Sequence, residues 1–216
     1  PDLVYLNLKQ TVNGSIDSDN HLTDINSYNV ISVGCGITTD ISVQSFVLDL
    51  ISNISEEQKL VIDADAINII AMQNKQISIS NAVITPHPKE LSRLLNVDID
   101  EIVENREKYA RIASQKYDCI TVLKGNETII TNGDKVYINK TGSSALAKAG
   151  TGDVLTGIIS GLCAQGASLF DAAIIGVFIH GYAGDIAASE LSKYCVLASD
   201  VIDYLPLAFM RILSYD

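Results

Sequence analysis

Four short apolar runs restrict what this chain can fold into more than any other feature. They span residues 30–33, 60–62, 82–84 and 119–123, and each ends in polar or glycine residues. Amphipathic helical patterns lie between them. Fully apolar strands that alternate with helices are typical of a parallel sheet covered by helices on both faces. Because such sheets bind ligands at the carboxyl ends of their strands, the pattern predicts an α/β fold with its site at that edge.

The rest of the chain completes this outline. Helical patterns occupy residues 41–54, 90–95, 102–117, 153–165, 169–191 and 198–213, and residues 4–8 have the composition of a strand. The β-rich stretches 128–131 and 135–138 flank Asn132-Gly133-Asp134, which predicts a hairpin because Asn-Gly suits a tight turn. Hydrophobic residues make up 47% of the 216 residues, and no linker or repeat interrupts them. We therefore expect residues 1–216 to form one domain with a full core.

The charge and the cysteines narrow the partners and the compartment. The chain has 26 acidic and 15 basic residues, a formal net charge of −11, and no basic run. Nucleic acids and anionic membranes are therefore not expected as partners. The four cysteines are scattered, without a CxxC pair, which indicates buried thiols in a reducing compartment. No apolar run of transmembrane length is apparent, so a cytoplasmic location is expected.

The motif Gly150-Thr151-Gly152-Asp153 precedes an apolar helical stretch. Glycine lets backbone N–H groups approach an anion, and a helix that begins there adds the positive end of its dipole. Phosphate is the natural ligand of such a loop. Asp153, next to it, fits a base that takes a proton from an alcohol during phosphoryl transfer. The alternative is an ordinary loop in which Thr151 or Asp153 caps the helix, and the motif alone does not separate the two.

Two acids and a histidine follow other apolar runs. Asp63 and Asp65, with Asn68 one turn later, can accept hydrogen bonds from a sugar or amide, or steer Mg²⁺ through its waters. One of them can instead cap the next helix, for which Asp65 is the better candidate. His87 lies between two prolines that stiffen its backbone, so we expect a ligand contact rather than a structural role. Glu90 follows near a helix start.

Two further loops and one histidine in a helical stretch are also candidates for ligand binding. Gly34-Cys35-Gly36 allows close approach of a ligand or forms a plain turn, and it is not a dinucleotide fingerprint. The segment 124–128 offers a cation, a flexible glycine and a hydroxyl for a nucleotide, unless its lysine simply faces solvent. It is not a Walker P-loop. His180, within an apolar helical stretch, is expected to pack internally.

Four segments together resemble the ADP/ATP-dependent NAD(P)H-hydrate dehydratases, a repair family of the ribokinase-like superfamily. They are VIDADAIN (61–68), ITPHPKE (84–90), VLKGNETII (122–130) and AGTGDVLTGIISGLCAQG (149–166). The resemblance runs from about Gly34 to the carboxyl end. It implies a ribokinase-like three-layer α/β/α fold with a mostly parallel central sheet and a β-hairpin.

The resemblance also implies a reaction. The hydroxyl of hydrated NADH or NADPH is phosphorylated by ADP or ATP, phosphate leaves, and the ring double bond returns. Asp153 would activate the hydroxyl, and ADP would be the favoured phosphoryl donor. Mg²⁺ would be present, with no residue assigned as its ligand. The assembly would be a homotetramer. The substrate would contact Gly36, Asp63, His87, Asn68 and Asp153. The nucleotide would contact Lys124, Gly125, Asn126, Glu127, Thr128, Gly150, Thr151 and Gly152.

The chain departs from the family pattern at several points. Cys35 stands in a loop that is usually Gly-Pro-Gly-Leu-Gly, Ala149 and Lys89 replace common glycines, and Ser143-Ser144 replace a usual Asn-Pro. These changes are expected to shift affinity rather than remove the site. Family members also carry further chain upstream, so an amino-terminal segment is expected to be missing. Two alternatives stay open: a ribokinase-like kinase of a small alcohol or vitamin precursor, and a non-catalytic nucleotide-binding remnant.

Overall fold

The computed structural model describes residues 4–20, 25–73 and 77–213. Six strands form one sheet whose spatial order is the order of the chain. They are β1 (Val30–Val33), β2 (Lys59–Ile62), β3 (Ala82–Ile84), β4 (Ile120–Leu123), β5 (Ile129–Thr131) and β6 (Val136–Ile138). The first four are parallel, and β5 and β6 continue the sheet as an antiparallel hairpin. The predicted parallel sheet and hairpin are confirmed.

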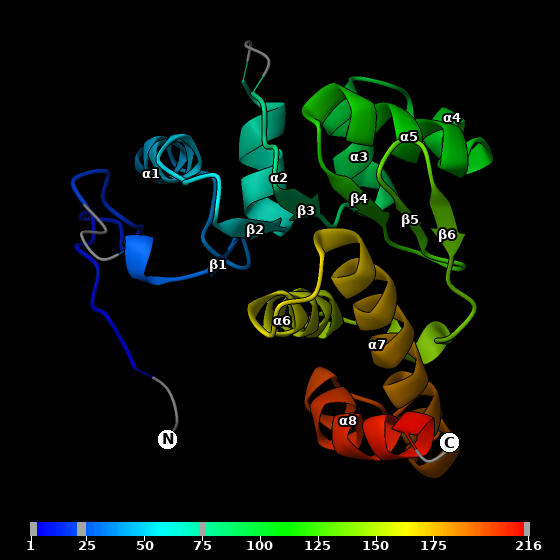
Figure 1. The fold of residues 1–216 in the computed structure, drawn as a ribbon. Helices are drawn as coiled ribbons and strands as arrows, with labels where there is room; N and C mark the ends of the chain where they lie inside the picture. Colours follow the sequence, from blue (N-terminus) through cyan, green and yellow to red (C-terminus); the bar gives the residue numbers. More distant parts are fainter. Residues whose placement is uncertain (1–3, 21–24, 74–76, 214–216) are drawn as a thin grey trace.

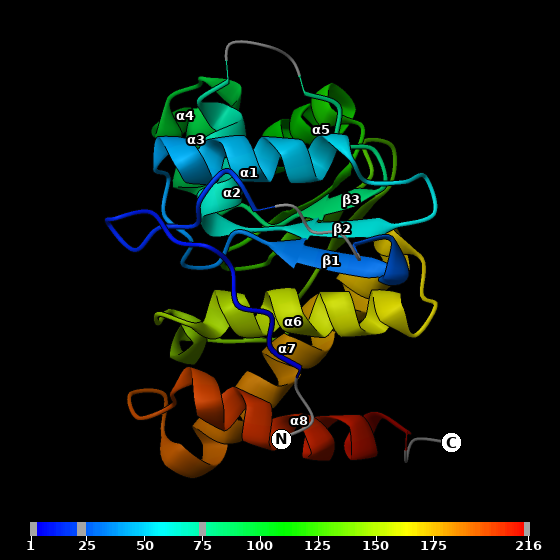
Figure 2. The same ribbon diagram turned by 90° about the vertical axis from the view of Figure 1, so that its left-hand side faces the viewer.

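Helices cover the sheet on both faces, as Figures 1 and 2 show. One face carries α1 (Ile41–Ser52), α2 (Ala64–Ala71), α3 (Pro88–Leu95), α4 (Ile99–Glu104) and α5 (Arg106–Tyr117). The other carries α6 (Thr151–Ala164) and α7 (Leu169–Leu191), with α8 (Ala198–Leu213) on the outer side of α7. Each parallel crossover steps in the same direction with the same hand, so the connecting helices collect on one face. The predicted three-layer α/β/α fold is confirmed.

Alternating side chains of the strands fill two cores. Leu60, Ile62 and Ile84 belong to the core under α1–α5. Val61, Val83 and Val122 belong to the core under α6 and α7. Since both faces of β2 and β3 are buried, residues 60–62 and 82–84 are apolar throughout rather than alternating with polar residues, which is why these runs are continuous in the sequence.

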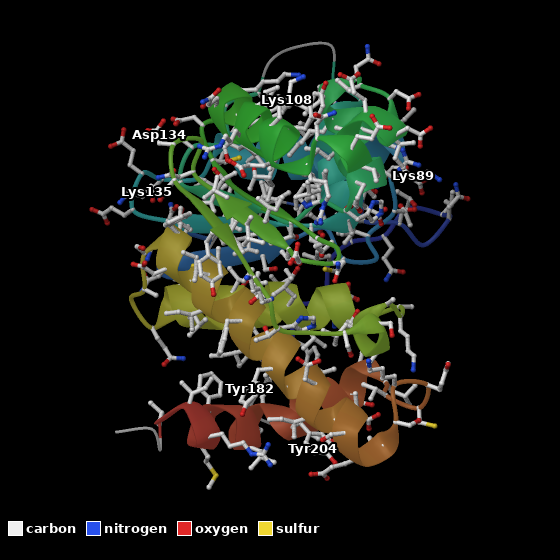
Figure 3. All side chains as sticks on the ribbon, turned by 90° about the vertical axis from the view of Figure 1, so that its right-hand side faces the viewer. Lys89, Lys108, Asp134, Lys135, Tyr182 and Tyr204 are labelled. Atoms are coloured by element: carbon white, nitrogen blue, oxygen red, sulfur yellow. The ribbon has the colours of Figure 1, made fainter. Side chains whose placement is uncertain are left out.

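The helix α7 is, by length and composition alone, apolar enough to cross a membrane. However, 56% of its most apolar window is buried inside the fold. It lies between the sheet and α8, and Figure 3 labels Tyr182 on α7 and Tyr204 on α8. The Tyr204 hydroxyl donates to Glu190 at 2.6 Å, which ties the two helices together. The expectation that no apolar run reaches transmembrane length was wrong for residues 169–191, and burial in the core accounts for their apolar character.

Several local predictions were wrong. Residues 4–8 form no strand, because no neighbouring strand pairs with them. The helix expected over 102–117 is two helices, and Asn105 is both the last cap of α4 and the first cap of α5. Not all cysteines are buried: Cys195 is exposed and Cys35 is half-buried.

Candidate active site

The turn after β1 is built on Gly34, which has a φ of +128°. A Cβ on Gly34 would lie 1.8 Å from the backbone oxygen of Asp63, so any side chain there would collide with the neighbouring turn. The absence of that side chain lets the β1 and β2 ends lie against each other. Cys35, the next residue, is thereby brought to Asp63.

Asp63 follows β2 and begins α2 as its N-cap. Its side chain is 2% exposed and accepts three hydrogen bonds, from the Ala64 backbone N–H at 2.8 Å, Lys124 Nζ at 2.6 Å and Thr156 Oγ1 at 2.9 Å. The carboxylate therefore joins the ends of β2 and β4 to α6. The expectation that Asp65 suits the cap was wrong: Asp65 lies in the first turn and accepts from the Thr38 N–H at 2.9 Å.

Asp153 lies exposed in the first turn of α6. The N-cap of that helix is Gly150, with a φ of +85°, so neither Thr151 nor Asp153 caps it as the alternative reading required. The Thr151 hydroxyl instead donates to the carbonyls of Leu146 at 2.7 Å and Lys148 at 2.9 Å. The Asp153 carboxylate is left available at the positive end of a helix, where the first N–H groups have no partner within the helix.

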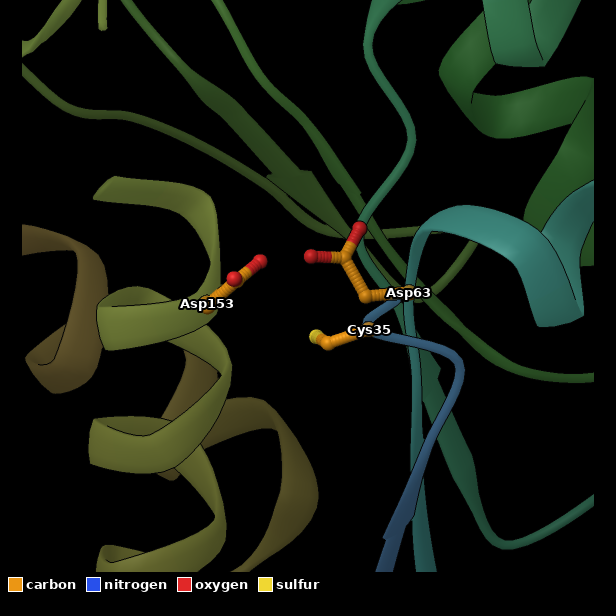
Figure 4. Close-up of side chains that lie close together, drawn as sticks. All are labelled: Cys35, Asp63 and Asp153. Atoms are coloured by element: carbon orange, nitrogen blue, oxygen red, sulfur yellow. The ribbon is translucent and has the colours of Figure 1, made fainter. Parts of the chain in front are cut away.

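Cys35, Asp63 and Asp153 point toward one another from three elements, as Figure 4 shows. One ligand atom from each lies within 4.8 Å of the others. The pKa of the Cys35 thiol is raised to about 12, chiefly by burial and then by the charges of Asp63 and Asp153, while the Lys124 charge acts in the opposite direction. A hydrogen bond to Asp153 acts in the same direction as burial, so Cys35 is a protonated thiol that donates to that carboxylate. The sequence analysis did not assign Cys35 a role.

A cavity of about 480 Å³ opens on the other side of Lys124 and Gly152. It brings together seven of the eight residues predicted to bind a nucleotide, all but Gly150. Its walls are residues 124–128 after β4, 139, 141–144, 146 and 147 after β6, Thr151, Gly152 and Leu155 of α6, and Val177, His180 and Gly181 of α7. Lys124 therefore faces both the cavity and the buried carboxylate of Asp63, rather than solvent alone.

The loop 124–128 is held by Arg106, which the sequence analysis missed. The Arg106 guanidinium donates to the carbonyls of Leu123 at 3.2 Å, Lys124 at 3.4 Å and Asn126. A Cβ on Gly125 would lie 2.9 Å from the guanidinium, so glycine admits it. Burial lowers the pKa of Arg106, and the Glu127 charge raises it. An arginine at a helix start gives no sequence signal for a loop about twenty residues later.

The opposite wall of the cavity is pinned to α7. Thr141 Oγ1 donates to the Phe178 carbonyl at 2.8 Å, and the Gly142 N–H donates to Asp185 at 2.7 Å. A Cβ on Gly181 would lie 2.3 Å from Thr141 Oγ1, so the loop and the helix touch through a glycine. Gly181 within an apolar helix was the signal that could have revealed this contact.

Comparison with known proteins shows the family of this chain. A model of the Carb_kinase family, described as NAD(P)H-hydrate dehydratase, matches residues 4–207. The chain belongs to the NAD(P)H-hydrate dehydratase family. A bifunctional NAD(P)H-hydrate repair enzyme of Moorella thermoacetica is 35% identical over 95% of this chain and 39% of its own length. An ADP-dependent (S)-NAD(P)H-hydrate dehydratase of Neisseria meningitidis is 34% identical over 79% of this chain and 59% of its own length.

The fold agrees with that membership. A crystal structure of the ADP/ATP-dependent NAD(P)H-hydrate dehydratase of Bacillus subtilis, co-crystallised with ATP and Mg²⁺ and soaked with CoA, superposes with a TM-score of 0.79. It is 31% identical and covers 90% of this chain and 69% of its own. Ribokinase-like proteins of known structure share the layered architecture. The chain spans about two fifths of the length of the bifunctional relatives.

In this member of the dehydratase family, three predicted substrate residues lie outside both the cavity and the carboxylate cluster. His87 is the N-cap of α3. Its ring Nδ1 accepts from the backbone N–H of Glu90 at 3.1 Å, and its backbone N–H donates to the Glu90 carboxylate at 2.8 Å. Its side chain remains 45% exposed. Asn68 accepts from Arg93 at 2.8 Å. Gly36, with a φ of +67°, has open space around its Cα.

Proposed function

We propose that this protein dehydrates hydrated NADH and NADPH to the intact dinucleotides, using an adenine nucleotide as phosphoryl donor. One observation carries the proposal. The Asp153 carboxylate lies in the first turn of α6, directly after Gly152. Gly152 and Lys124 both line the cavity of about 480 Å³. Phosphorylation of an alcohol requires a base next to the site that holds the phosphoryl donor. Membership of the dehydratase family supports the choice of substrate.

In the first proposed step, Asp153 accepts the proton of the ring hydroxyl while the hydroxyl oxygen bonds to the terminal phosphorus of the nucleotide. The bond from that phosphorus to the bridging oxygen breaks, so ADP leaves as AMP. In the second step the ring carbon–oxygen bond breaks, inorganic phosphate leaves, and the adjacent ring carbon loses a proton. The two electrons of that C–H bond form the restored double bond, and the ring nitrogen lone pair assists the departure of phosphate.

The chain supplies charge stabilisation for the first step. Lys124 is held at 2.6 Å from Asp63, so its ammonium group is already oriented before a nucleotide binds. The first N–H groups of α6 add donors that do not need to reorganise as charge moves onto the transferred phosphoryl group. The start of α6 lies close to this amine, since a Cβ on Gly152 would be in ordinary contact with it at 3.5 Å.

Magnesium fits this site through the nucleotide rather than through a protein cage. Both oxygens of Asp63 are engaged, and the protonated Cys35 sulfur is a poor ligand for a hard cation. Asp153 alone offers an exposed carboxylate, which suits a largely hydrated ion carried by phosphates. When bound, such an ion would neutralise phosphate charge. The Bacillus relative was crystallised with ATP and Mg²⁺.

Recovery of the absorbance of reduced nicotinamide tests the proposal. The purified protein, hydrated NADH, Mg²⁺ and ADP or ATP should give NADH and free phosphate in equal amounts. Asp153→Asn should lower the rate by about 10² or more, because it removes the base without changing the shape of the side chain. Asp203→Asn, an exposed acid on α8, serves as the matched control and should retain the rate. Recovery without nucleotide would contradict the proposal.

The products separate this function from the alternatives. A kinase of a small alcohol would leave phosphate on its substrate, whereas the dehydratase releases it. A non-catalytic remnant would bind nucleotide, but Asp153→Asn would change no turnover. We propose ADP as the preferred donor, which the ADP-dependent relative supports. A higher kcat/KM with ATP than with ADP would reverse that preference.

We also propose that the protein is a cytoplasmic homotetramer. The outer face of α8 supports association, since Ile202 is 52%, Met210 67% and Leu213 72% exposed. Light scattering of the purified protein should give four times the mass of one chain, and cell fractionation should place the protein with soluble enzymes. A monomeric mass would reject the assembly.

A further inference from the structure

Two residues that line the cavity each have a buried side-chain atom without a hydrogen-bond partner. In the part of the chain that the structure describes, three such atoms lack a hydrogen bond: Arg106 Nε, Ser143 Oγ and His180 Nε2. Ser143 and His180 both belong to the wall of the 480 Å³ cavity. Buried polar groups in folded proteins are almost always paired. Two unpaired groups on one cavity wall indicate that a ligand completes them.

The state of His180 decides which ligand group it can meet. The side chain lies in α7 and the residue is 8% exposed. The pKa of His180 is lowered to about 4, chiefly by burial and also by the nearby Lys124 charge, while a hydrogen bond to the Thr151 backbone acts in the opposite direction. A backbone group raises a histidine pKa when its carbonyl accepts from the ring, so the nitrogen facing Thr151 carries the proton. Nε2 then presents a lone pair at neutral pH.

An acceptor at Nε2 is unsuitable for a phosphate group, because phosphate oxygens are acceptors too. The phosphates have their own donors in this cavity, namely Lys124 and the start of α6. The donors of an adenine nucleotide lie on its nucleoside part: the ribose hydroxyls and the exocyclic amine. We infer that His180 Nε2 accepts a hydrogen bond from a donor of the nucleoside part of the bound adenine nucleotide, in a cavity that the Ser143 hydroxyl shares.

This inference rests on the proposed function only in placing an adenine nucleotide in the cavity. It assigns His180 to ligand binding, whereas the sequence analysis expected a histidine that packs internally. An internally satisfied histidine would have both ring nitrogens paired within the protein, and His180 Nε2 is not.

Calorimetric titration with matched variants and analogues tests the inference. An Asn side chain reaches the position of Nδ1 and a Gln side chain that of Nε2, so His180→Asn should keep the Thr151 contact and lose the ligand contact. We expect His180→Asn to weaken ADP binding about tenfold and His180→Gln to recover part of that loss. Binding of pyrophosphate should be unchanged in both variants.

The analogues identify the donor. Wild-type protein is titrated with ADP, 2′-deoxy-ADP, 3′-deoxy-ADP and inosine diphosphate, which lacks the exocyclic amine. The analogue that lacks the donor should bind wild type about tenfold more weakly than ADP, and His180→Asn should weaken it no further. Additive losses for every analogue, or equal ADP affinity in wild type and His180→Asn, would overturn the inference. So would a wild type that binds no nucleotide.

A measurement on the unaltered protein covers variants that do not fold. With ¹⁵N-histidine labelling, the chain has three histidines to assign. The Nε2 resonance of His180 should have the position of an unprotonated nitrogen and should move on addition of ADP but not of pyrophosphate. If His180 responds to ADP as expected but NADH is not recovered, only the proposed function is rejected. Normal recovery with an unmoved His180 resonance would reject this inference alone.

Discussion

The Asp63 carboxylate is shared by partners from different elements. It receives the Lys124 ammonium on one oxygen and the Thr156 hydroxyl on the other. It is almost fully buried, whereas Lys124 is 21% exposed. The acid is therefore the fixed member of the pair and the lysine the mobile one. The ion pair that orients Lys124 is therefore also part of the packing between the sheet and α6.

Replacing Asp63 should affect stability and activity together. Asp63→Asn keeps an oxygen for Thr156 but leaves Lys124 without its counter-ion. In a double-mutant cycle with Lys124→Met, denaturant unfolding should give a coupling free energy of about 1–3 kcal/mol. The kcat for NADH recovery should fall at least tenfold in Asp63→Asn, while Asp65→Asn serves as the neighbouring control. Additive effects of the two substitutions would show that the pair does not act as a unit.

The two partly accessible thiols should differ sharply in reactivity. The raised pKa of Cys35, about 12, leaves roughly 10⁻⁴ of it as thiolate at pH 8. Cys195 is exposed. Iodoacetamide at pH 8 should therefore modify one fast-reacting cysteine, and Cys195→Ser should remove that fast phase. Peptide mapping that finds Cys35 modified as quickly as Cys195 would contradict the arrangement around Asp153.

At the scale of elements, the turn between β1 and α1 depends on a glycine for space rather than for conformation alone. Gly34 and Gly36 both have positive φ, but only Gly34 lacks room for a Cβ. Gly36→Ala should lower the free energy of unfolding by about 1 kcal/mol, the cost of a left-handed alanine. Gly34→Ala adds a collision with the Asp63 carbonyl, so it should prevent the turn from forming. Denaturant unfolding of both variants measures the difference, and equal losses would exclude the steric reason.

The elements that could be predicted are those with a local cause. Continuous apolar runs gave β1 to β4, Asn132-Gly133 gave the hairpin, and the bounds of α7 and α8 agree with the periodicity. Helix starts were less predictable. Gly150 rather than Thr151 or Asp153 caps α6, because the Thr151 hydroxyl is taken by the Leu146 and Lys148 carbonyls. Those acceptors are oriented by the preceding loop, which local sequence patterns do not describe.

The site was predictable as residues but not as contacts. The strand ends pointed to Asp63 and Lys124, because parallel strands place their carboxyl ends at one edge, and the glycine motif before α6 pointed to Asp153. The bond from Thr156 to Asp63 joins residues 93 positions apart, and that from Lys124 to Asp63 joins residues 61 apart. Nothing local in a helix such as α6 marks which of its threonines turns inward. Arg106 was missed for the same reason.

At the scale of the whole molecule, His180 makes stability depend on pH. Its pKa is lowered by burial from 6.5 to about 4 in the folded protein, so between those values the unfolded chain binds a proton that the folded one does not. The free energy of unfolding should therefore fall as the pH drops from 6.5 to 4, by about 3 kcal/mol from this residue. Above pH 6.5, His180 does not make the free energy of unfolding change with pH.

Chemical denaturation at a series of pH values measures this effect. His180→Gln lacks the titration, so the difference between wild type and variant isolates His180 from the carboxylates that titrate in the same range. The wild-type curve should steepen relative to the variant as the pH drops below 6.5. Parallel curves would show that the imidazole is not held neutral in the folded protein.

The order of the strands has a consequence for synthesis on the ribosome. Because β1 to β6 are laid down side by side as the chain emerges, and α1 to α5 all settle on one face, the other face stays bare until α6 and α7 follow. Until those two helices are made, the nascent chain exposes a wide apolar face of the sheet, a natural surface for chaperones. Asp153 arrives on the very helix that covers it. The proposed base is thus in place only when the sheet is closed, so a half-made chain should not carry out the proposed chemistry.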